Sequence, residues 1–440
     1  MYISVYIKLI LFFLMYMTSY TNDINTRWCC CWCLCVIVFV INVVMGFHYI
    51  DTGKSIAFNA TFINVKPMYT FITSSHILNK CHYTLPSITL NIGTPQQQYT
   101  FIISTETYLS YIIHYNTTTT TTSSTFTYDN ATLNDLVNGH YHNHKLYGYI
   151  GKDIMHVDSS NEITFAFINV NESDSTCNNI GISGSIGIMK KYMSVYDRIY
   201  SNENYSFINT LEEHDVIDKR RFAFDFTSED DIKHEITFGK RYTNLSYCDS
   251  SYRYLSNIWY CDFVGVKYHN EVIVRTEEIM YFETQFPFII LSDKTGKAVF
   301  ERLLLKYTMC NVDQSDNKEF IICEDVSNSG IMHEQLVFMF DHNVEVVIKL
   351  SDVYQHGVLM LFRELGGDAS SFGAVVFKNR IVVFDQEAKA IGFSEYHIHS
   401  HTPIHNNNNN KYSIYKKQMY VLIIISNCLC ILLMLFVTYN

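Results

Sequence analysis

Short stretches in which apolar and polar residues alternate recur from residue 83 to residue 385, and they constrain the fold most. A period of two residues is typical of half-buried β-strands. The stretches lie at residues 83–93, 98–104, 162–170, 221–227, 235–240, 287–292, 345–350, 374–378 and 380–385. Because such short strands must pack their apolar faces against one another, we predict a mostly β chain folded as two β lobes.

Length and charge agree with this prediction and exclude one class of partner. The chain has 440 residues, of which 48% are hydrophobic, so it can bury the cores of two lobes. Helices are expected only as connectors, near residues 130–137, 190–200 and 297–308. The net charge is -11 and no run of basic residues occurs, so we expect no nucleic-acid partner.

Three segments are apolar enough to enter a membrane: residues 2–20, 28–47 and 419–438. Residues 1–47 therefore predict a signal peptide or signal anchor. Residues 48–80 are interpreted as a lead-in and residues 399–418 as a stalk. The last apolar segment predicts a transmembrane helix, with a GPI-anchor signal as the alternative.

Cysteines and glycosylation sequons favour an oxidising compartment. Six of the 13 cysteines lie between the apolar segments, an even number that suits disulfides. Six Asn-x-Ser/Thr sequons lie in the same region, at Asn59, Asn116, Asn130, Asn171, Asn204 and Asn244. We expect a membrane protein of the secretory pathway, with its main domain lumenal or extracellular.

Motifs in the first half of the chain resemble one protease family. The turn Gly93-Thr94-Pro95, followed by Gln97, joins two predicted strands. From Tyr141 the chain runs YHNHKLYGYIGKDIM, a spacing that is similar to the flap hairpin of the pepsin-like aspartic proteases of A1 type. The resemblance implies a bilobal fold with a cleft between the lobes and Tyr141 at the tip of the flap.

The second half carries the family's closing pattern, FGAVVFKNRIVVFDQEAKAIGFSEY at residues 372–396. Cys310 and Cys323 resemble the disulfide of the family's second lobe, especially in its membrane-anchored, plasmepsin-V-like branch. The resemblance implies a first lobe at residues 81–240 and a second lobe at residues 241–398. It also implies a peptide or protein segment as the ligand of the cleft.

Aspartic proteolysis requires two carboxylates that share a proton, one acting as acid and the other as base. The family presents them on two Asp-Thr/Ser-Gly loops. In the first loop of this chain, the resemblance places Ser104 at the Asp position, Thr105 at the Thr position and Glu106 at the Gly position. A serine is no base near neutral pH.

The second loop is interpreted as lying in IILSDKT. There Leu291 would replace the Asp, Ser292 would keep the hydroxyl, Asp293 would replace the Gly, and Thr295 would match a hydroxyl of the family. Leucine does not titrate, so this alignment leaves neither catalytic carboxylate in place.

The leading hypothesis is a membrane-tethered homologue of these proteases that is catalytically inactive and binds peptide or protein in its cleft. The alternative is an active endopeptidase in which Glu106 and Asp293 form a displaced dyad. A purely structural protein with a filled cleft is the third hypothesis.

Other motifs do not lead to a separate function. His140, His142 and His144 alternate along one predicted strand, and we interpret them as a polar flap edge and not as a metal site. No cofactor and no metal is expected. The triplet Asp51-Thr52-Gly53 lies upstream of the Gly-Thr-Pro turn, whereas the family's triplet follows that turn, so we interpret it as a coincidence.

Overall fold

The structure, a computed structural model, describes a part of the chain that falls in one compact unit, Thr52–His399. Its described residues are 53–65, 83–113, 123–128, 139–141, 144–157, 161–173, 182–189, 206–228, 234–250, 258–315, 317–323, 330–355 and 357–396. The three apolar segments, Asp51 and the helices predicted at 130–137 and 190–200 lie outside these residues and stay predictions. Within the described residues, no helix has both the length and the apolar character that a membrane crossing requires.

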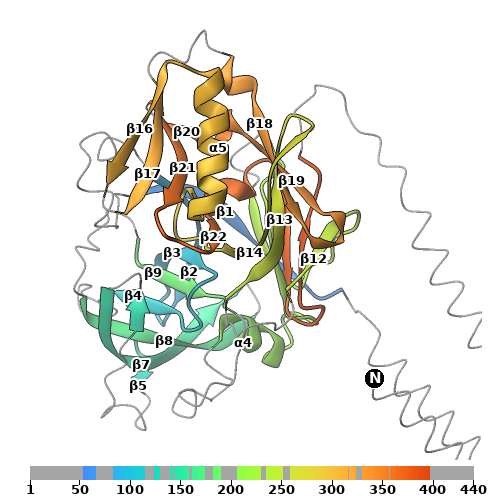
Figure 1. Cartoon of the computed structure of the whole chain (residues 1–440). Helices are drawn as coiled ribbons and strands as arrows, with labels where there is room; N and C mark the ends of the chain where they lie inside the picture. Colours follow the sequence, from blue (N-terminus) through green and yellow to red (C-terminus); the bar gives the residue numbers. More distant parts are fainter. Residues whose placement is uncertain are drawn as a thin grey trace, which may run out of the picture. The chain divides into compact units, whose positions relative to one another are not determined.

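The first half of the unit is built mainly of strands. Its elements are β1 (Ile56–Val65), β2 (Tyr83–Ile92), β3 (Gln97–Ser104), β4 (Tyr111–Ile113), β5 (Thr127–Tyr128), β6 (Gly139–Tyr141), β7 (His144–His156), β8 (Glu162–Ser173), β9 (Gly184–Gly187), α4 (Phe207–Glu213), β10 (Arg221–Asp225) and β11 (Glu235–Phe238). In Figure 1, α4 and the strands β2, β3, β4, β5, β7, β8 and β9 lie in the lower part of the picture.

The second half has the longest helix of the described residues. Its elements are β12 (Ser246–Asp249), β13 (Tyr260–Tyr268), β14 (Glu271–Phe282), β15 (Ile289–Leu291), α5 (Asp293–Lys306), β16 (Cys310–Ser315), β17 (Lys318–Cys323), η6 (Ile331–His333), β18 (Gln335–Phe340), η7 (Asp341–Asn343), β19 (Glu345–Lys349), α6 (Leu350–Val353), β20 (Tyr354–Gln355), β21 (Val358–Glu364), β22 (Ser370–Phe372), η8 (Ala374–Phe377), β23 (Ile381–Asp385) and β24 (Ala390–Phe393).

The described strands form two sheets. The larger has the order β12-β24-β23-β10-β11-β1-β2-β3-β9-β4-β8-β7-β5, with β6 beside β7. The smaller has the order β16-β17-β21-β15-β22-β14-β13-β18-β19, with β20 beside β21. The larger sheet includes β12, β23 and β24 of the second half, so one sheet contains strands of both halves. The mostly β, two-lobed prediction is confirmed.

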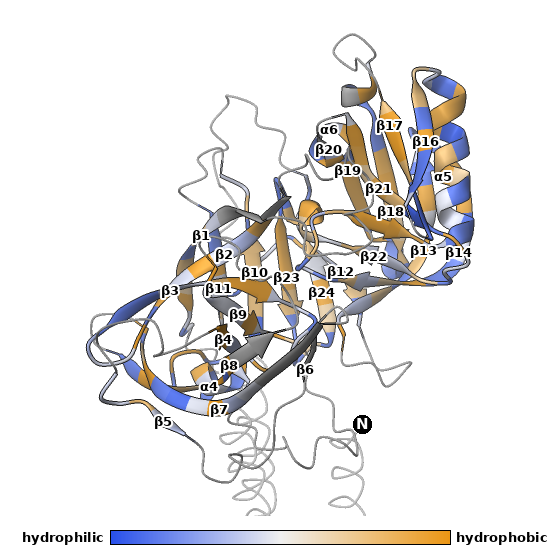
Figure 2. Cartoon of the chain, turned by 90° about the vertical axis from the view of Figure 1, so that its left-hand side faces the viewer, coloured by the Kyte–Doolittle hydropathy of each residue, from blue (hydrophilic) through white to orange (hydrophobic). Residues whose placement is uncertain are grey.

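The strand pair β10–β23 joins the halves, and its core is aromatic. Phe222 of β10 lies opposite Phe384 of β23, and their rings stack at 4.7 Å between centroids and 9° between planes. Trp259 packs edge-on against both rings and donates from Nε1 to the carbonyl oxygen of Ile188 over 3.0 Å. Strands such as β18 and β21 are correspondingly orange in the hydropathy view of Figure 2.

Local predictions were mostly correct, with two errors. The helix expected at 297–308 is α5, whose N-cap Ser292 accepts a hydrogen bond from the amide of Thr295. Residues 374–378 were predicted as a strand, but Ala374–Phe377 form a 3₁₀ helix whose residues are all buried, a pattern that periodicity alone does not separate from a strand. The lead-in at 48–80 contains β1, which pairs with β11 and then with β2.

Two disulfides lie in the second half. Cys310 and Cys323 are bonded, as the family resemblance implied, and they face each other across the β16–β17 ladder. Cys248 and Cys261 form a second bond that the sequence analysis did not pair. All four cysteines are buried. Each disulfide closes a short loop and thereby restricts the unfolded chain.

Replacing the aromatic ring that joins the halves should destabilise the unit. We expect Phe222→Ala to lower the free energy of unfolding by about 3–5 kcal/mol, because the cavity would open against Phe384 and Trp259. Urea unfolding followed by Trp fluorescence measures this change. Leu305, which is 80% exposed, gives the control Leu305→Ala, expected to stay within about 0.5 kcal/mol. Equal effects of the two substitutions would contradict the described core.

Candidate active site

Two loops in the two halves occupy equivalent places. β3 runs parallel to β9, with Ser104 beside Gly187, and then leads through a loop into β4. In the same way β14 runs parallel to β22, with Phe282 beside Phe372, and leads through a loop into β15. β4 then pairs antiparallel with β9, and β15 pairs antiparallel with β22. The two loops therefore have the same topological surroundings.

Two glycines fix the equivalence of the loops residue by residue. A Cβ on Gly187 would lie 2.7 Å from the carbonyl oxygens of Thr107 and Leu109. A Cβ on Gly373 would lie 2.3 and 2.4 Å from the carbonyl oxygens of Phe286 and Phe288. Both strand ends thus require glycine because a loop packs directly on them. Residues 107 and 109 correspond to 286 and 288.

This offset makes Glu283 the counterpart of Ser104, Thr284 the counterpart of Thr105, and Gln285 the counterpart of Glu106. The first loop reads Ser-Thr-Glu and the second reads Glu-Thr-Gln. Only the threonine is common to both.

The two threonines clasp the loops together. The hydroxyl of Thr105 donates to the carbonyl oxygen of Phe282 over 2.6 Å and accepts from the amide of Thr284 over 3.1 Å. Reciprocally, the hydroxyl of Thr284 donates to the carbonyl oxygen of Ile103 over 2.5 Å and accepts from the amide of Thr105 over 3.1 Å. Both threonines are fully buried. We call this set of four hydrogen bonds the threonine clasp.

Ser104 is fully buried, and its hydroxyl serves its own loop. Its Oγ accepts hydrogen bonds from the amides of Glu106, over 3.2 Å, and Thr107, over 3.0 Å. A hydroxyl in this role shapes the turn but offers no carboxylate.

Glu283 is the one carboxylate at the two equivalent positions. It is half-buried, its amide donates to the carbonyl oxygen of Phe372 over 2.9 Å, and its Oε2 accepts a hydrogen bond from the hydroxyl of Ser371. Two residues further on the difference is reversed, because the first loop carries the carboxyl of Glu106 and the second the neutral amide of Gln285. The pair of positions therefore presents a serine and a glutamate.

Comparison with protein families agrees with the two-lobed fold and its paired loops. Residues 87–396 match the family model of the eukaryotic aspartyl protease. The chain belongs to this pepsin-like family. A search among curated proteins found no match. The match covers both loops of the threonine clasp and most strands of both sheets, so the two-lobed architecture is that of the family.

The structure corrects the predicted position of the second loop. Leu291 was assigned to the second Asp position, but it ends β15, is fully buried and pairs with Arg363 of β21. The threonine clasp instead places Glu283 at that position. The alignment was wrong because the apolar run 288–291 contains β15, which comes after the loop. The family triplet comes at the end of the strand before the loop, which here is β14.

Ser292, Asp293 and Thr295 belong to the start of α5. Ser292 is the N-cap, and Asp293 forms a hydrogen-bonded ion pair with Arg363, at 2.8 Å from its Nε and 2.5 Å from its NH2 group. This guanidinium holds the pKa of Asp293 below its usual range. A carboxylate neutralised by arginine is unsuited to sharing a proton with another carboxylate.

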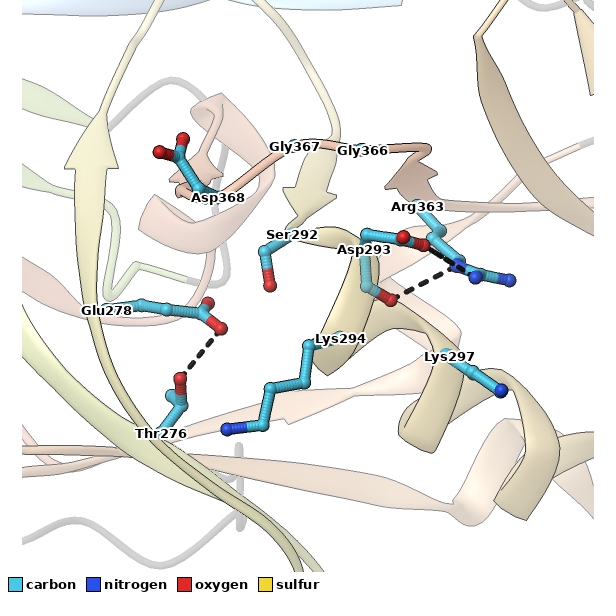
Figure 3. A pocket seen from close by; sticks show the side chains of 10 residues that line it. All are labelled: Thr276, Glu278, Ser292, Asp293, Lys294, Lys297, Arg363, Gly366, Gly367 and Asp368. Carbon is cyan, nitrogen blue, oxygen red and sulfur yellow. Dashed lines mark hydrogen bonds and ion pairs between the residues drawn. The ribbon is translucent and has the colours of Figure 1, made fainter.

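The proposed displaced dyad therefore loses its geometric basis. Its premise was that Glu106 and Asp293 occupy matching places, but the residue that matches Glu106 is Gln285. Asp293 lines a separate hollow of about 560 Å³ on the second half, with Glu278, Lys294 and Arg363 among its neighbours and Glu106 not among them (Figure 3).

The hydroxyl of Thr295 binds Glu278, one of the residues that line this hollow. Its Oγ1 donates to the carboxylate of Glu278, at 3.1 and 3.2 Å from the two oxygens. Thr276 and Ser370 also donate to Glu278, over 2.7 and 3.2 Å. Glu278 thereby connects β14, α5 and β22 behind the second loop. We infer a structural role for this residue.

Two other predicted features are placed only in part. Tyr141 ends β6 and pairs with His144 at the start of β7, so it lies in a hairpin as expected for the flap; its side chain lies outside what is described. His140 and His144 belong to the same hairpin, and His142 falls outside the described residues. Among the residues that the structure describes, no three His, Cys, Asp or Glu side chains group as metal ligands do.

The sequence analysis missed Glu283, Thr284, Gln285 and Ser371. One signal could have found the loop: Glu-Thr follows the long strand 271–282 directly, and it keeps both a carboxyl group and the threonine of the family triplet. A search that accepted glutamate for aspartate would have placed the second loop there.

The threonine clasp yields a test of the site's architecture. We expect Thr105→Val to lower the free energy of unfolding by about 2–4 kcal/mol, since it leaves the Phe282 carbonyl and the Thr284 amide buried without partners. Thermal unfolding followed by circular dichroism measures the loss. The exposed Thr89, whose hydroxyl lies 3.5 Å from that of Thr100, supplies the control Thr89→Val, expected to have little effect. A Thr105→Val variant as stable as this control would contradict the clasp.

Proposed function

We propose that the chain binds extended peptide segments between its lobes and does not cleave them by the aspartic mechanism. The observation that carries the proposal is Ser104 at a position where the mechanism requires a carboxylate. Its hydroxyl is occupied by two amides of its own loop, and the equivalent position of the other loop holds Glu283, so the two positions together carry one carboxylate.

Cleavage is not expected because the two carboxylates of the dyad have different roles. Two carboxylates held together repel each other, so one keeps a proton while the other activates water. A serine does not titrate in this range and cannot force such a split. Loss of one essential group typically removes several orders of magnitude in rate.

Peptide binding is supported by what remains. The threonine clasp, the paired loops and the hairpin β6–β7 are all present, and the family resemblance implies a cleft between the lobes that receives a peptide segment. Binding of that kind uses main-chain hydrogen bonds and side-chain pockets, neither of which needs a catalytic carboxylate.

The membrane and compartment assignments are part of the same proposal. Residues 419–438 would anchor the chain, and the unit would face the lumen or the cell exterior, in the manner of the membrane-anchored, plasmepsin-V-like branch. Two disulfides support an oxidising compartment. The sequon residues Asn59 and Asn244 have exposed side chains, as acceptors of glycans require.

A cleavage assay tests the proposal. The purified full-length chain should leave a mixed library of quenched fluorescent peptides intact from acidic to neutral pH. The same chain should bind members of that library, as measured by fluorescence anisotropy. Its heat-unfolded form is the control for binding that does not depend on the fold.

Two results would contradict the proposal. One is acid-dependent cleavage that disappears in Glu283→Gln, because that would show a working carboxylate mechanism. The other is the absence of any peptide retained above the unfolded control, because that would leave a fold without a ligand and favour the purely structural hypothesis.

A further inference from the structure

Two neighbouring serines of β22 have different partners, and the difference concerns the loop pair. Successive side chains of a strand point to opposite faces. Ser370 donates to Glu278 over 3.2 Å and accepts from the amide of Ser292 over 3.0 Å, so it belongs to the structural group behind the loop. Ser371 donates its hydroxyl proton to the carboxylate of Glu283 at the equivalent of a catalytic Asp position.

An activated nucleophile requires a hydroxyl that donates a hydrogen bond to a base, and Ser371 meets this requirement. It also requires that further contacts hold the base in orientation. Glu283 meets this condition, because its amide is bound to the carbonyl oxygen of Phe372 and the next residue, Thr284, is locked in the threonine clasp. Glu283 is half-buried and Ser371 is 6% exposed.

We propose that Ser371 is a nucleophile activated by Glu283, and that this pair transfers acyl groups from esters of peptide-like carboxylic acids to water. The inference rests on the proposed function in one respect, namely that peptide-like ligands reach the loop pair. It differs from aspartic proteolysis because the attacking atom is the serine oxygen and one carboxylate suffices.

The reaction balances without any added oxidant, reductant or cofactor. Glu283 takes the hydroxyl proton while Ser371 Oγ attacks the ester carbonyl, and the alcohol leaves with that proton. Water then attacks the acyl-serine and gives a proton to Glu283, which returns it to Ser371 Oγ as the acid departs. One ester and one water become one acid and one alcohol.

Esters are the substrate class that fits Glu283 as the base. A carboxylate is a weaker base toward a hydroxyl than the imidazole of a Ser-His pair, so the step is favoured when the leaving group departs easily. An alcohol or phenol leaves more easily than the amine of a peptide bond. The pair should therefore act on esters while leaving peptides intact.

Covalent labelling tests the inference on the full-length chain. A fluorophosphonate reagent should modify Ser371, identified by mass spectrometry, and aryl esters of N-acyl amino acids should be hydrolysed. Ser371→Ala should lose both signals, and Glu283→Gln should slow both by about 100-fold, the scale of general-base catalysis.

The neighbouring serine supplies the matched control. Ser370→Ala removes a hydroxyl from the same strand and should keep labelling and esterase activity. Absence of labelling in the wild-type chain, or labelling unchanged in Ser371→Ala, would overturn the inference. Peptide binding, measured by anisotropy on the same samples, separates the two proposals: binding without labelling contradicts only the nucleophile, and loss of binding contradicts the proposed function.

Discussion

The threonine clasp is the constraint on which the rest of the site depends. The hydroxyls of Thr105 and Thr284 each form hydrogen bonds with the backbone of the opposite loop, and both side chains are buried from water. Because a buried polar group without a partner is costly, each threonine requires the other. The two loops are consequently fixed in relation to each other whatever side chains precede and follow the threonines. Chemistry at positions 104 and 283 can change while the frame stays.

This separation allows the family's architecture to persist with a serine at position 104 and a glutamate at position 283. The glycines at 187 and 373 are required by loop packing, and the threonines by the clasp. The carboxylates are required only by catalysis. Ser104 satisfies two amides of its loop, and Glu283 accepts from Ser371, so both replacements fit locally without disturbing the frame.

Much of the fold could be predicted from the sequence, because period-two alternation survives in most strands and the closing motif at residues 372–396 marks the end of the second half. The second loop was misplaced, since its triplet has neither aspartate nor glycine, while the apolar strand β15 followed by Ser292 and Asp293 resembles the family pattern. β1 was missed although residues 56–65 pair with two strands, because the lead-in was judged by its polar and aromatic composition. Ser371 could not be predicted as a site residue, since its hydrogen bond to Glu283 joins the neighbouring strands β14 and β22 at their ends. No spacing in the sequence indicates this contact.

The ladder between β10 and β23 bears on how this molecule would tolerate a break in its backbone. Five residue pairs, from Arg221 with Asp385 to Asp225 with Ile381, connect a strand of the first half to a strand near the end of the second. The halves are thus held together by the β10–β23 ladder as well as by the covalent chain between β11 and β12. A cut between β11 and β12 would produce two fragments that remain associated through this ladder and through the stacked rings of Phe222 and Phe384. The protein would then persist as a two-chain molecule with its paired loops intact.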